Sequence, residues 1–400
     1  MTLDSAVYAF VDDFVDEGVP QVAQRLAAQG FSAVSLAAVY HAARDLLPHN
    51  PRRVVAHRGE GVHYFPPAAT LYRAALKPLA APRAALPEVA AAVGAAGLSW
   101  HAWTVYLHNG RLASARPDCA VTNAFGDVYE TDLCPSSSEA ADYAAALTAD
   151  VARLRPALIA AESLHHAGFA HGAHHERAFV PVSPIADFLL SLCFCASCVS
   201  RAGARVDVEQ LAAGVRGVVR DELRSPTASP HGLDRDALAQ RCGSQLPAYL
   251  AVRESTVTEL VARCASLARE HGVRFGFIDQ AGALKGYASG EPTGPSSCAD
   301  AWRLGVEPRA VAGVVDAYIA LAYAKSPDRV AFDVRDYVSS LGGTPLRCVL
   351  RHGAPDLVDA GDLREKVDAA RENGADAADF YHYGLMPLSG LDAAAAAIGS

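Results

Sequence analysis

The sequence predicts an α/β protein, a (β/α)8 TIM barrel that residues 1–400 form as a single domain. Short apolar runs rich in β-branched residues alternate about eight times with Ala-rich helical stretches along the chain. The runs are continuously apolar, which is typical of parallel strands that are buried on both faces. Eight such units without a break in composition favour a closed barrel. The runner-up is an open doubly wound sheet, but no run is followed by a G-x-G-x-x-G motif.

The expected strands follow one another at intervals that leave room for a helix in between. They are Val7–Phe14, Ala33–Tyr40, Ser99–Leu107, Ala157–Leu164, Val273–Ile278, Val314–Ala322, Leu346–Leu350 and Ala377–Tyr381. The helices expected around them include Val19–Gln29, Pro87–Ala96, Glu139–Leu154 and Leu391–Ile398. The first two of these helices end directly before a glycine, the residue that most often terminates helices.

Long insertions are expected after strands two, four and five, at about residues 41–86, 165–245 and 280–310. Barrels carry their active sites on the loops that follow the strands, so insertions on this side are where substrate-specific loops belong.

Composition limits the classes of function. The apolar fraction of 51% is enough for a large core, and the net charge of −9 argues against nucleic acid or an anionic membrane as a partner. No apolar stretch reaches the roughly 18 to 20 residues that span a bilayer, and residues 1–5 do not resemble the start of a signal peptide. The nine cysteines form no disulfide-like framework, so we expect a cytoplasmic protein. The sequence leaves open whether the chain forms a homo-oligomer.

Three thiols lie within six residues, at Cys193, Cys195 and Cys198. This C-x-C-x-x-C spacing lets one loop direct three sulfurs at a single ion, and Cys134 on a separate connection offers a fourth. Zinc binds four thiolates tetrahedrally, and such a closed site is structural because catalysis needs an open coordination position. We therefore expect these four residues to bind a structural Zn²⁺. The alternatives are buried, inert thiols and, less favoured, redox chemistry.

Two carboxylates stand at expected strand ends, where barrels place catalytic groups. Glu162 ends strand four behind the apolar residues 159–161, which would raise its pKa toward the range useful for a general acid. Asp279 ends strand five, with Asp12 and Asp13 of strand one as rivals. Glycosidic bond cleavage uses such a pair, because one carboxyl protonates the leaving oxygen while the other attacks the sugar or activates water. We expect Glu162 and Asp279 to be catalytic.

Imidazoles, phenols and one guanidinium occupy the other strand ends and loops, a mixture that suits a polyhydroxylated ligand. The expected substrate-binding residues are Asp12, Asp13, His41, Glu60, His63, Tyr64, His108, His165, His166, Tyr323, Arg351, His382 and Tyr383. The His-rich segment 165–175 is interpreted as a loop lining a sugar cleft, with a second metal site as the alternative. For the carboxylates, the structural alternative is an ion pair with Arg351 or Arg58.

The Cys-Pro-x-Ser element at residues 134–137, combined with C-x-C-x-x-C after strand four, resembles the zinc-containing β-galactosidases of glycoside hydrolase family 42. It is also similar to hypothetical glycosyl hydrolases that carry a Cys-aromatic-Cys-x-x-Cys run. The resemblance covers roughly residues 98–200 and implies that the four cysteines bind a structural zinc and that Glu162 is the acid/base. Two positions depart from the family. Ala161 stands where the family has Asn, and Arg351 stands where its nucleophilic Glu ends strand seven.

The sequence thus predicts a glycoside hydrolase-like enzyme that acts on a small sugar or glycoside by a two-carboxylate mechanism. Two alternatives remain. One is a sugar isomerase, epimerase or lyase with Glu162 or Asp279 as the base, with or without a divalent metal. The other is a non-catalytic carbohydrate-binding barrel, which the guanidinium of Arg351 in place of a carboxylate favours.

Overall fold

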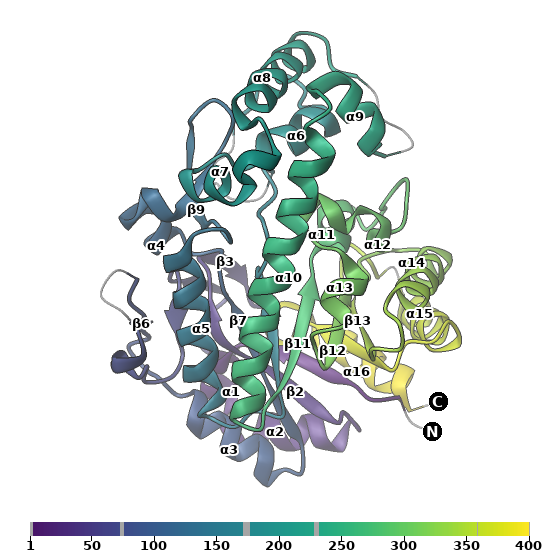
Figure 1. The fold of residues 1–400 in the computed structure, drawn as a ribbon. Helices are drawn as coiled ribbons and strands as arrows, with labels where there is room; N and C mark the ends of the chain where they lie inside the picture. Colours follow the sequence, from purple (N-terminus) through teal and green to yellow (C-terminus); the bar gives the residue numbers. More distant parts are fainter. Residues whose placement is uncertain (1–2, 73–75, 171–176, 228–231, 358, 400) are drawn as a thin grey trace.

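Eight parallel strands close into a barrel in the computed structural model, which describes residues 3–72, 76–170, 177–227, 232–357 and 359–399 (Figure 1). The barrel strands are β1 (Ala6–Ala9), β2 (Ala33–Tyr40), β7 (Ser99–Val105), β10 (Leu158–Glu162), β11 (Arg274–Asp279), β12 (Ala317–Leu321), β13 (Leu346–Arg351) and β14 (Ala377–Tyr381). Each strand pairs in parallel with its neighbours, and β1 pairs with both β2 and β14, which closes the sheet. The predicted (β/α)8 barrel is confirmed.

The first expected strand, Val7–Phe14, is too long. The strand ends at Ala9, and helix α1 (Val11–Glu17) begins directly after Phe10. Asp13 stabilises this change of direction, because its carboxylate accepts the backbone N–H of Phe10 at 2.8 Å. Asp12 and Asp13 therefore belong to the first turn of a helix, where acidic residues are favourable, and do not end a strand.

Helices surround the barrel and bury one apolar face each against the strands (Figure 1). They are α2 (Val19–Ala28), α3 (Leu86–Ala95), α5 (Ser138–Ala152), α10 (Leu246–Glu270), α13 (Pro308–Ala312), α14 (Pro327–Ser340), α15 (Ala360–Glu372) and α16 (Leu388–Ile398). For the four helices whose bounds were predicted, α2, α3, α5 and α16, the observed bounds differ from the predicted ones by up to three residues.

Additional elements lie between the barrel strands. After β2 come β3 (Ala43–Leu46), β4 (Val55–Arg58), β5 (Val62–His63), η1 (Ala69–Leu71) and β6 (Leu79–Ala80). After β7 come α4 (Gly110–Ala115), η2 (Pro117–Cys119), β8 (Ala120–Thr122) and β9 (Val128–Leu133), an excursion that the sequence analysis did not include. After β11 come α11 (Ala281–Gly286), α12 (Ser297–Asp300) and η4 (Ala301–Leu304), and η5 (Tyr383–Leu385) follows β14.

The longest excursion, between β10 and β11, is a group of helices at one end of the molecule (Figure 1). It contains α6 (Pro184–Ser191), α7 (Ala196–Ala202), η3 (Gly203–Arg205), α8 (Val208–Arg224) and α9 (Arg235–Cys242), and the chain returns to the barrel along α10. The main hydrophobic core fills the barrel and the layer under its helices. A second core combines this helical group with Val121, Ala124 and Cys134 from the excursion after β7, and it includes the four candidate zinc ligands.

In the described part of the chain, no single helix has the length and apolar character to cross a membrane. One bent pair, Pro184–Ser191 with Ala196–Arg205, meets that test by length and composition only.

Candidate active site

A cavity of about 360 Å³ opens at the carboxyl ends of the barrel strands, and every barrel strand contributes to its wall. The strand residues that line it are Tyr8, Tyr40, Trp103, Glu162, Ile278, Leu321, Val349 and Tyr381. The loops after the strands add His41, His108, Asp132, Ser163, His165, Gln280, Lys285, Tyr287 and Tyr323 among others. The wall combines one strand-end carboxyl with phenols, imidazoles and apolar surface, as small-molecule sites do.

Glu162, the last residue of β10, is held in this wall by two donors. Its Oε1 accepts a hydrogen bond from Gln280 Nε2 at 2.9 Å, and its Oε2 accepts one from the indole N–H of Trp103. The hydroxyl of Ser163 donates to Gln280 Oε1 at 3.2 Å and so keeps the amide nitrogen turned toward Glu162. Burial raises the pKa of Glu162, while the Trp103 hydrogen bond and the charge of His108 oppose the rise.

His108 and Asp132 form a second polar group in the cavity. His108 Nδ1 lies 2.9 Å from Asp132 Oδ1, and the hydroxyl of Thr131 donates to Asp132 Oδ2 at 2.7 Å. Burial alone would favour the neutral imidazole, but Asp132 outweighs it and raises the pKa of His108 to about 8. His108 is therefore mostly an imidazolium at pH 7, and the ring of His41 meets it edge-on at 4.8 Å.

Five tyrosines line the cavity. Burial raises the pKa of four of them, Tyr8, Tyr40, Tyr323 and Tyr381, so these four stay neutral and are able to donate or accept hydrogen bonds. The hydroxyls of Tyr40 and Tyr381 lie 3.4 Å apart. The hydroxyl of Tyr8 is buried and has no hydrogen-bond partner among the described residues, which leaves it available to a ligand in the cavity.

Five of the predicted site residues line the cavity: Glu162, His41, His108, His165 and Tyr323. Ten others are not in its wall: Asp12, Asp13, Glu60, His63, Tyr64, His166, Asp279, Arg351, His382 and Tyr383. For most of these ten residues, the hydrogen-bond partners show where the side chain is directed.

Asp279, expected as the second catalytic carboxylate, points away from the cavity. Its neighbours Ile278 and Gln280 line the wall, and successive strand residues face opposite sides, so Asp279 faces the surrounding helices. Its Oδ2 accepts hydrogen bonds from the hydroxyls of Tyr318 at 2.7 Å and Tyr337 of α14 at 2.9 Å. Its Oδ1 accepts the N–H of Ala281 at 2.9 Å. The structure does not bring Asp279 together with Glu162.

Arg351, at the end of β13, supports the wall from behind. Its Nε and Nη2 form a bidentate pair with Asp356 at 2.8 and 2.6 Å, and the carbonyls of Tyr287 and Gly286 accept further bonds at 2.7 and 2.9 Å. Its guanidinium carbon lies 4.3 Å from the ring centroid of Tyr323. A Cβ at position 286 would lie 2.0 Å from the Tyr323 carbonyl oxygen, so only glycine lets α11 approach this closely.

The other predicted carboxylates bind parts of the chain to each other. Asp12 pairs with Arg53 at 3.2 Å, and Asp13 caps α1 with a pKa that burial raises to about 7. Glu60 accepts the N–H of Ala42 at 3.0 Å and that of Gly110 at 2.9 Å, which ties the loops after β2 and β7 together.

The remaining predicted imidazoles and phenols outside the wall are buried in the packing around it. His63 Nδ1 lies 3.3 Å from the Gly61 carbonyl, and burial lowers the pKa of His63 to about 4. His382 Nδ1 accepts the N–H of Gly384, and Tyr383 donates to Glu17 at 2.8 Å. Tyr64 belongs to the main core, and His166 is buried beside the helical group.

The cavity opens into a larger groove of about 950 Å³. The two share Asp132, Gly168, Ala170, Leu284 and Lys285, and the groove continues along β9 toward α6 and η4. Two of its three cations are matched by acids, since Lys285 pairs with Asp300 at 2.7 Å and Arg303 pairs with Asp187 at 3.3 Å. The third, Arg177, is exposed in the groove.

Several cavity residues were missed by the sequence analysis. Trp103 and Gln280, which hold Glu162, and Asp132, which charges His108, were not selected. Asp132 lies on β9, outside the barrel, so no strand-end pattern identifies it. Trp103 and Tyr8 lie within their strands, and sequence alone does not separate them from core aromatics.

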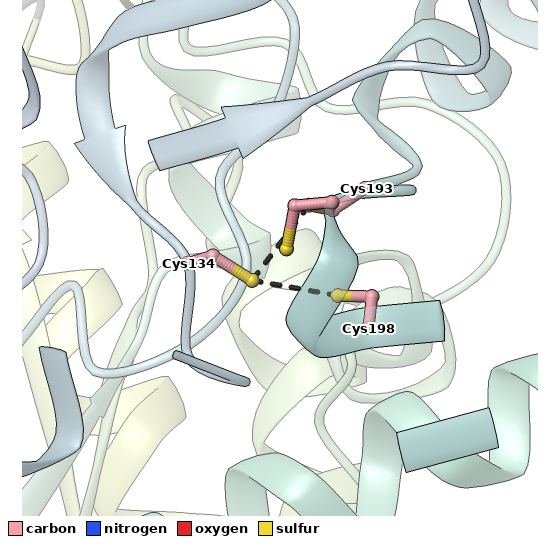
Figure 2. Close-up of side chains that lie close together, drawn as sticks. Cys134, Cys193 and Cys198 are labelled. Atoms are coloured by element: carbon pink, nitrogen blue, oxygen red, sulfur yellow. Dashed lines mark hydrogen bonds between the residues drawn. The ribbon is translucent and has the colours of Figure 1, made fainter. Parts of the chain in front are cut away.

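The four predicted metal ligands do come together. Cys134 Sγ lies 3.4 Å from Cys198 Sγ and 3.7 Å from Cys193 Sγ (Figure 2), and Cys195 joins them in a group whose sulfurs all lie within 4.8 Å of one another. All four residues are buried. A tetrahedral zinc with Zn–S bonds of roughly 2.3 Å separates its sulfurs by about 3.8 Å, so this donor set fits the ion.

The second metal site considered for segment 165–175 is not supported by the residues that the structure describes. His165 and His166 belong to no group with metal-ligand spacing there, and His165 Nδ1 donates to the His166 carbonyl at 2.8 Å. Residues 171–176 lie outside the described residues.

No protein-family model matches the sequence, and comparison with curated proteins gives no match. Solved structures do match. The chain is similar to a β-galactosidase from the haloarchaeon Halorubrum lacusprofundi, with 15% identity and a TM-score of 0.58 over 99% of this chain and 58% of that one. It is also similar to the catalytic domain of a β-amylase from Paenibacillus polymyxa, with 12% identity and a TM-score of 0.55 over 97% of this chain and 96% of that one.

A β-galactosidase from Marinomonas ef1 matches with 11% identity and a TM-score of 0.56 over 99% of this chain and 59% of that one. The chain thus spans less than two thirds of the length of the two β-galactosidases. At these identities the similarity shows the barrel fold alone.

Proposed function

We propose that the chain is a glycoside hydrolase-like enzyme that acts on a small, neutral carbohydrate or glycoside in the cavity, with Glu162 as the general acid. The observation that carries the proposal is a carboxyl with a raised pKa in the wall of a cavity lined by neutral phenols. A raised pKa keeps a carboxyl protonated until it delivers its proton to the leaving oxygen. The solved structures that share the fold include enzymes named as β-galactosidases and a β-amylase, which is consistent with this proposal.

The second carboxylate in the proposal is Asp132. Among the described residues, Glu162 and Asp132 are the carboxylates that line the cavity. Arg351 occupies the end of β13, where the family 42 pattern has its nucleophile, and Asp279 faces the outer helices. We therefore infer that Asp132 activates a water molecule while the imidazolium of His108 binds the substrate. Attack by water in a single displacement inverts the anomeric centre.

The four cysteines complete the proposal as ligands of a structural zinc. The cluster is buried in the second core, and its donors are all thiols, the set that closed structural sites use. All nine cysteines are unpaired, which suits a reducing compartment such as the cytoplasm.

A second candidate is a barrel that binds carbohydrate without turning it over. The observation that favours it is Arg351, because a guanidinium tied to Asp356 replaces the strand-end carboxylate of the family that the sequence resembles.

The experiment is a screen of the wild-type chain against nitrophenyl glycosides of both anomers and of several sugars, with the anomer of the released sugar followed by NMR. Turnover with inversion supports the proposal. Turnover with retention would contradict the role of Asp132. Sugar binding in a thermal-shift assay without turnover of any glycoside would favour the second candidate.

A further inference from the structure

Arg253 is a buried cation for which the described residues supply no ion-pair partner. It lies on α10, is 2% exposed, and donates from Nη2 to the Arg303 carbonyl at 3.3 Å. Its Nε and Nη1 have no hydrogen-bond partner, and no carboxylate pairs with it in the described part of the chain. An unpaired charge in a protein interior costs several kcal/mol, so a compensating negative group is expected nearby.

The cysteine cluster packs against the same stretch of α10. Tyr249, one helical turn before Arg253, donates its hydroxyl to the Cys193 carbonyl, and its ring stacks on Phe194 at 5.3 Å. Helix α7, which carries Cys198, packs beside α10 (Figure 1). Burial lowers the pKa of Arg253, and the electrostatic effects of Tyr249, Cys198, Cys193 and Glu254 oppose that change; Glu254 itself pairs with Arg235 at 2.6 Å.

A zinc–thiolate cluster at this position would carry negative charge. Four thiolates and one Zn²⁺ carry a net charge of −2, and all four cysteines are buried. The polar groups bonded to the sulfurs are neutral: the N–H of Thr122 lies 3.4 Å from Cys193 Sγ, and the hydroxyl of Ser136 lies 3.2 Å from Cys198 Sγ. These groups supply hydrogen bonds but no charge.

We propose that Arg253 is the counter-cation of the zinc–thiolate cluster and holds the metal in place electrostatically from α10. This inference rests on the structural zinc proposed above. Outer-shell partners of this kind change metal affinity by about 10- to 100-fold when they are removed. The role of Arg253 would be to lower the rate at which zinc leaves, and that role is independent of the chemistry in the barrel cavity.

The test measures the zinc content of the purified chain and the rate at which zinc transfers to a chromogenic chelator. Arg253→Met is expected to release zinc at least about ten-fold faster than wild type. Arg253→Lys keeps the charge and is expected to stay close to wild type. Arg263→Gln on the same helix is the control, because Arg263 is exposed and pairs with Asp142 at 2.7 Å.

The outcomes separate the two proposals. A wild-type chain without bound metal would overturn the structural zinc and this inference with it. A fully loaded Arg253→Met variant that releases zinc at the wild-type rate would overturn only the role of Arg253.

A second measurement covers the case in which Arg253→Met is poorly folded. In the Cys195→Ser/Cys198→Ser background the anionic cluster is weakened, so Arg253 is left uncompensated. Arg253→Met is then expected to lower the melting temperature of the wild-type chain but to leave that of the double variant unchanged or higher. Equal losses in both backgrounds would show that Arg253 only packs the helix.

Discussion

Glu162 and Asp279 stand at the carboxyl ends of adjacent barrel strands, yet the structure gives them opposite surroundings. Glu162 lies in the cavity wall, held by Trp103 and Gln280, whereas Asp279 lies outside it. Burial raises the pKa of both carboxyls. A raised pKa therefore does not identify a catalytic group unless the group also faces a space that a substrate can enter.

The largest effect on turnover is expected from substitution of Glu162. Glu162→Gln removes the proton donor and is expected to lower kcat by at least about 100-fold, the range that general acids supply, with the fold intact. Steady-state kinetics measures kcat, and circular dichroism tests whether the fold is intact. The control is Glu259→Gln, since Glu259 is exposed on α10 and pairs with Arg201 at 2.8 Å. Wild-type turnover in Glu162→Gln would end the proposed mechanism.

Asp279→Asn tests the other side of the comparison. The carboxylate accepts from three donors, and an amide turns one acceptor into a donor that faces the Ala281 N–H or the hydroxyls of Tyr318 and Tyr337. We expect a loss of about 1–3 kcal/mol in the free energy of unfolding, measured in urea, with turnover of the folded protein near wild type. Unchanged stability combined with lost turnover would show that Asp279 takes part in the reaction.

The pairing of His108 with Asp132 is expected to make the stability of the fold depend on pH. The pKa of His108, about 8, lies above its ordinary 6.5, so the pairing with Asp132 stabilises the fold fully below pH 6.5 and is lost as the pH rises through 8. The loss amounts to about 2 kcal/mol. In Asp132→Asn the pKa of His108 is expected to fall well below 8, and this pH dependence is expected to disappear. NMR titration of the imidazole measures the first change and urea unfolding at several pH values the second; an unmoved pKa would disprove the pairing.

The smallest expected effect concerns the donor to Glu162. Trp103→Phe removes the indole hydrogen bond that stabilises the carboxylate, so the pKa of Glu162 rises further. Because a general acid works while protonated, the basic limb of the pH–rate profile is expected to move to higher pH by about one unit or less. Trp100→Phe on the same strand is the control, as Trp100 is outside the cavity wall. A shift to lower pH would contradict the assignment of the acid.

Much of the fold could be predicted from the sequence because parallel strands buried on both faces leave continuous apolar runs. The first strand failed because Val11 and Phe14, which extend the apolar run, are buried residues of a helix. The cysteine grouping was predictable in part from local spacing, since Cys193, Cys195 and Cys198 lie on one turn and its flanks. Cys134 was predicted as the fourth ligand because tetrahedral zinc needs one more thiolate, and the resemblance to a known family added support.

The site was only partly predictable because facing alternates with every residue of a strand. Gln280 lines the cavity while Asp279 does not, and Tyr381 lines it while His382 does not. The sequence shows which residues near a strand end are polar, but it does not locate the strand end to within one residue. It therefore does not show which of these side chains face the cavity. Asp132 follows no strand-end pattern, because it reaches the cavity from β9, outside the barrel.

The most direct test of the central claim is a crystal structure of the Glu162→Gln variant soaked with a mixture of monosaccharides. We expect a sugar in the barrel cavity, hydrogen-bonded to the side chain at position 162 and within reach of Asp132. A sugar bound on another surface, with the cavity empty of it, would contradict the proposed active site.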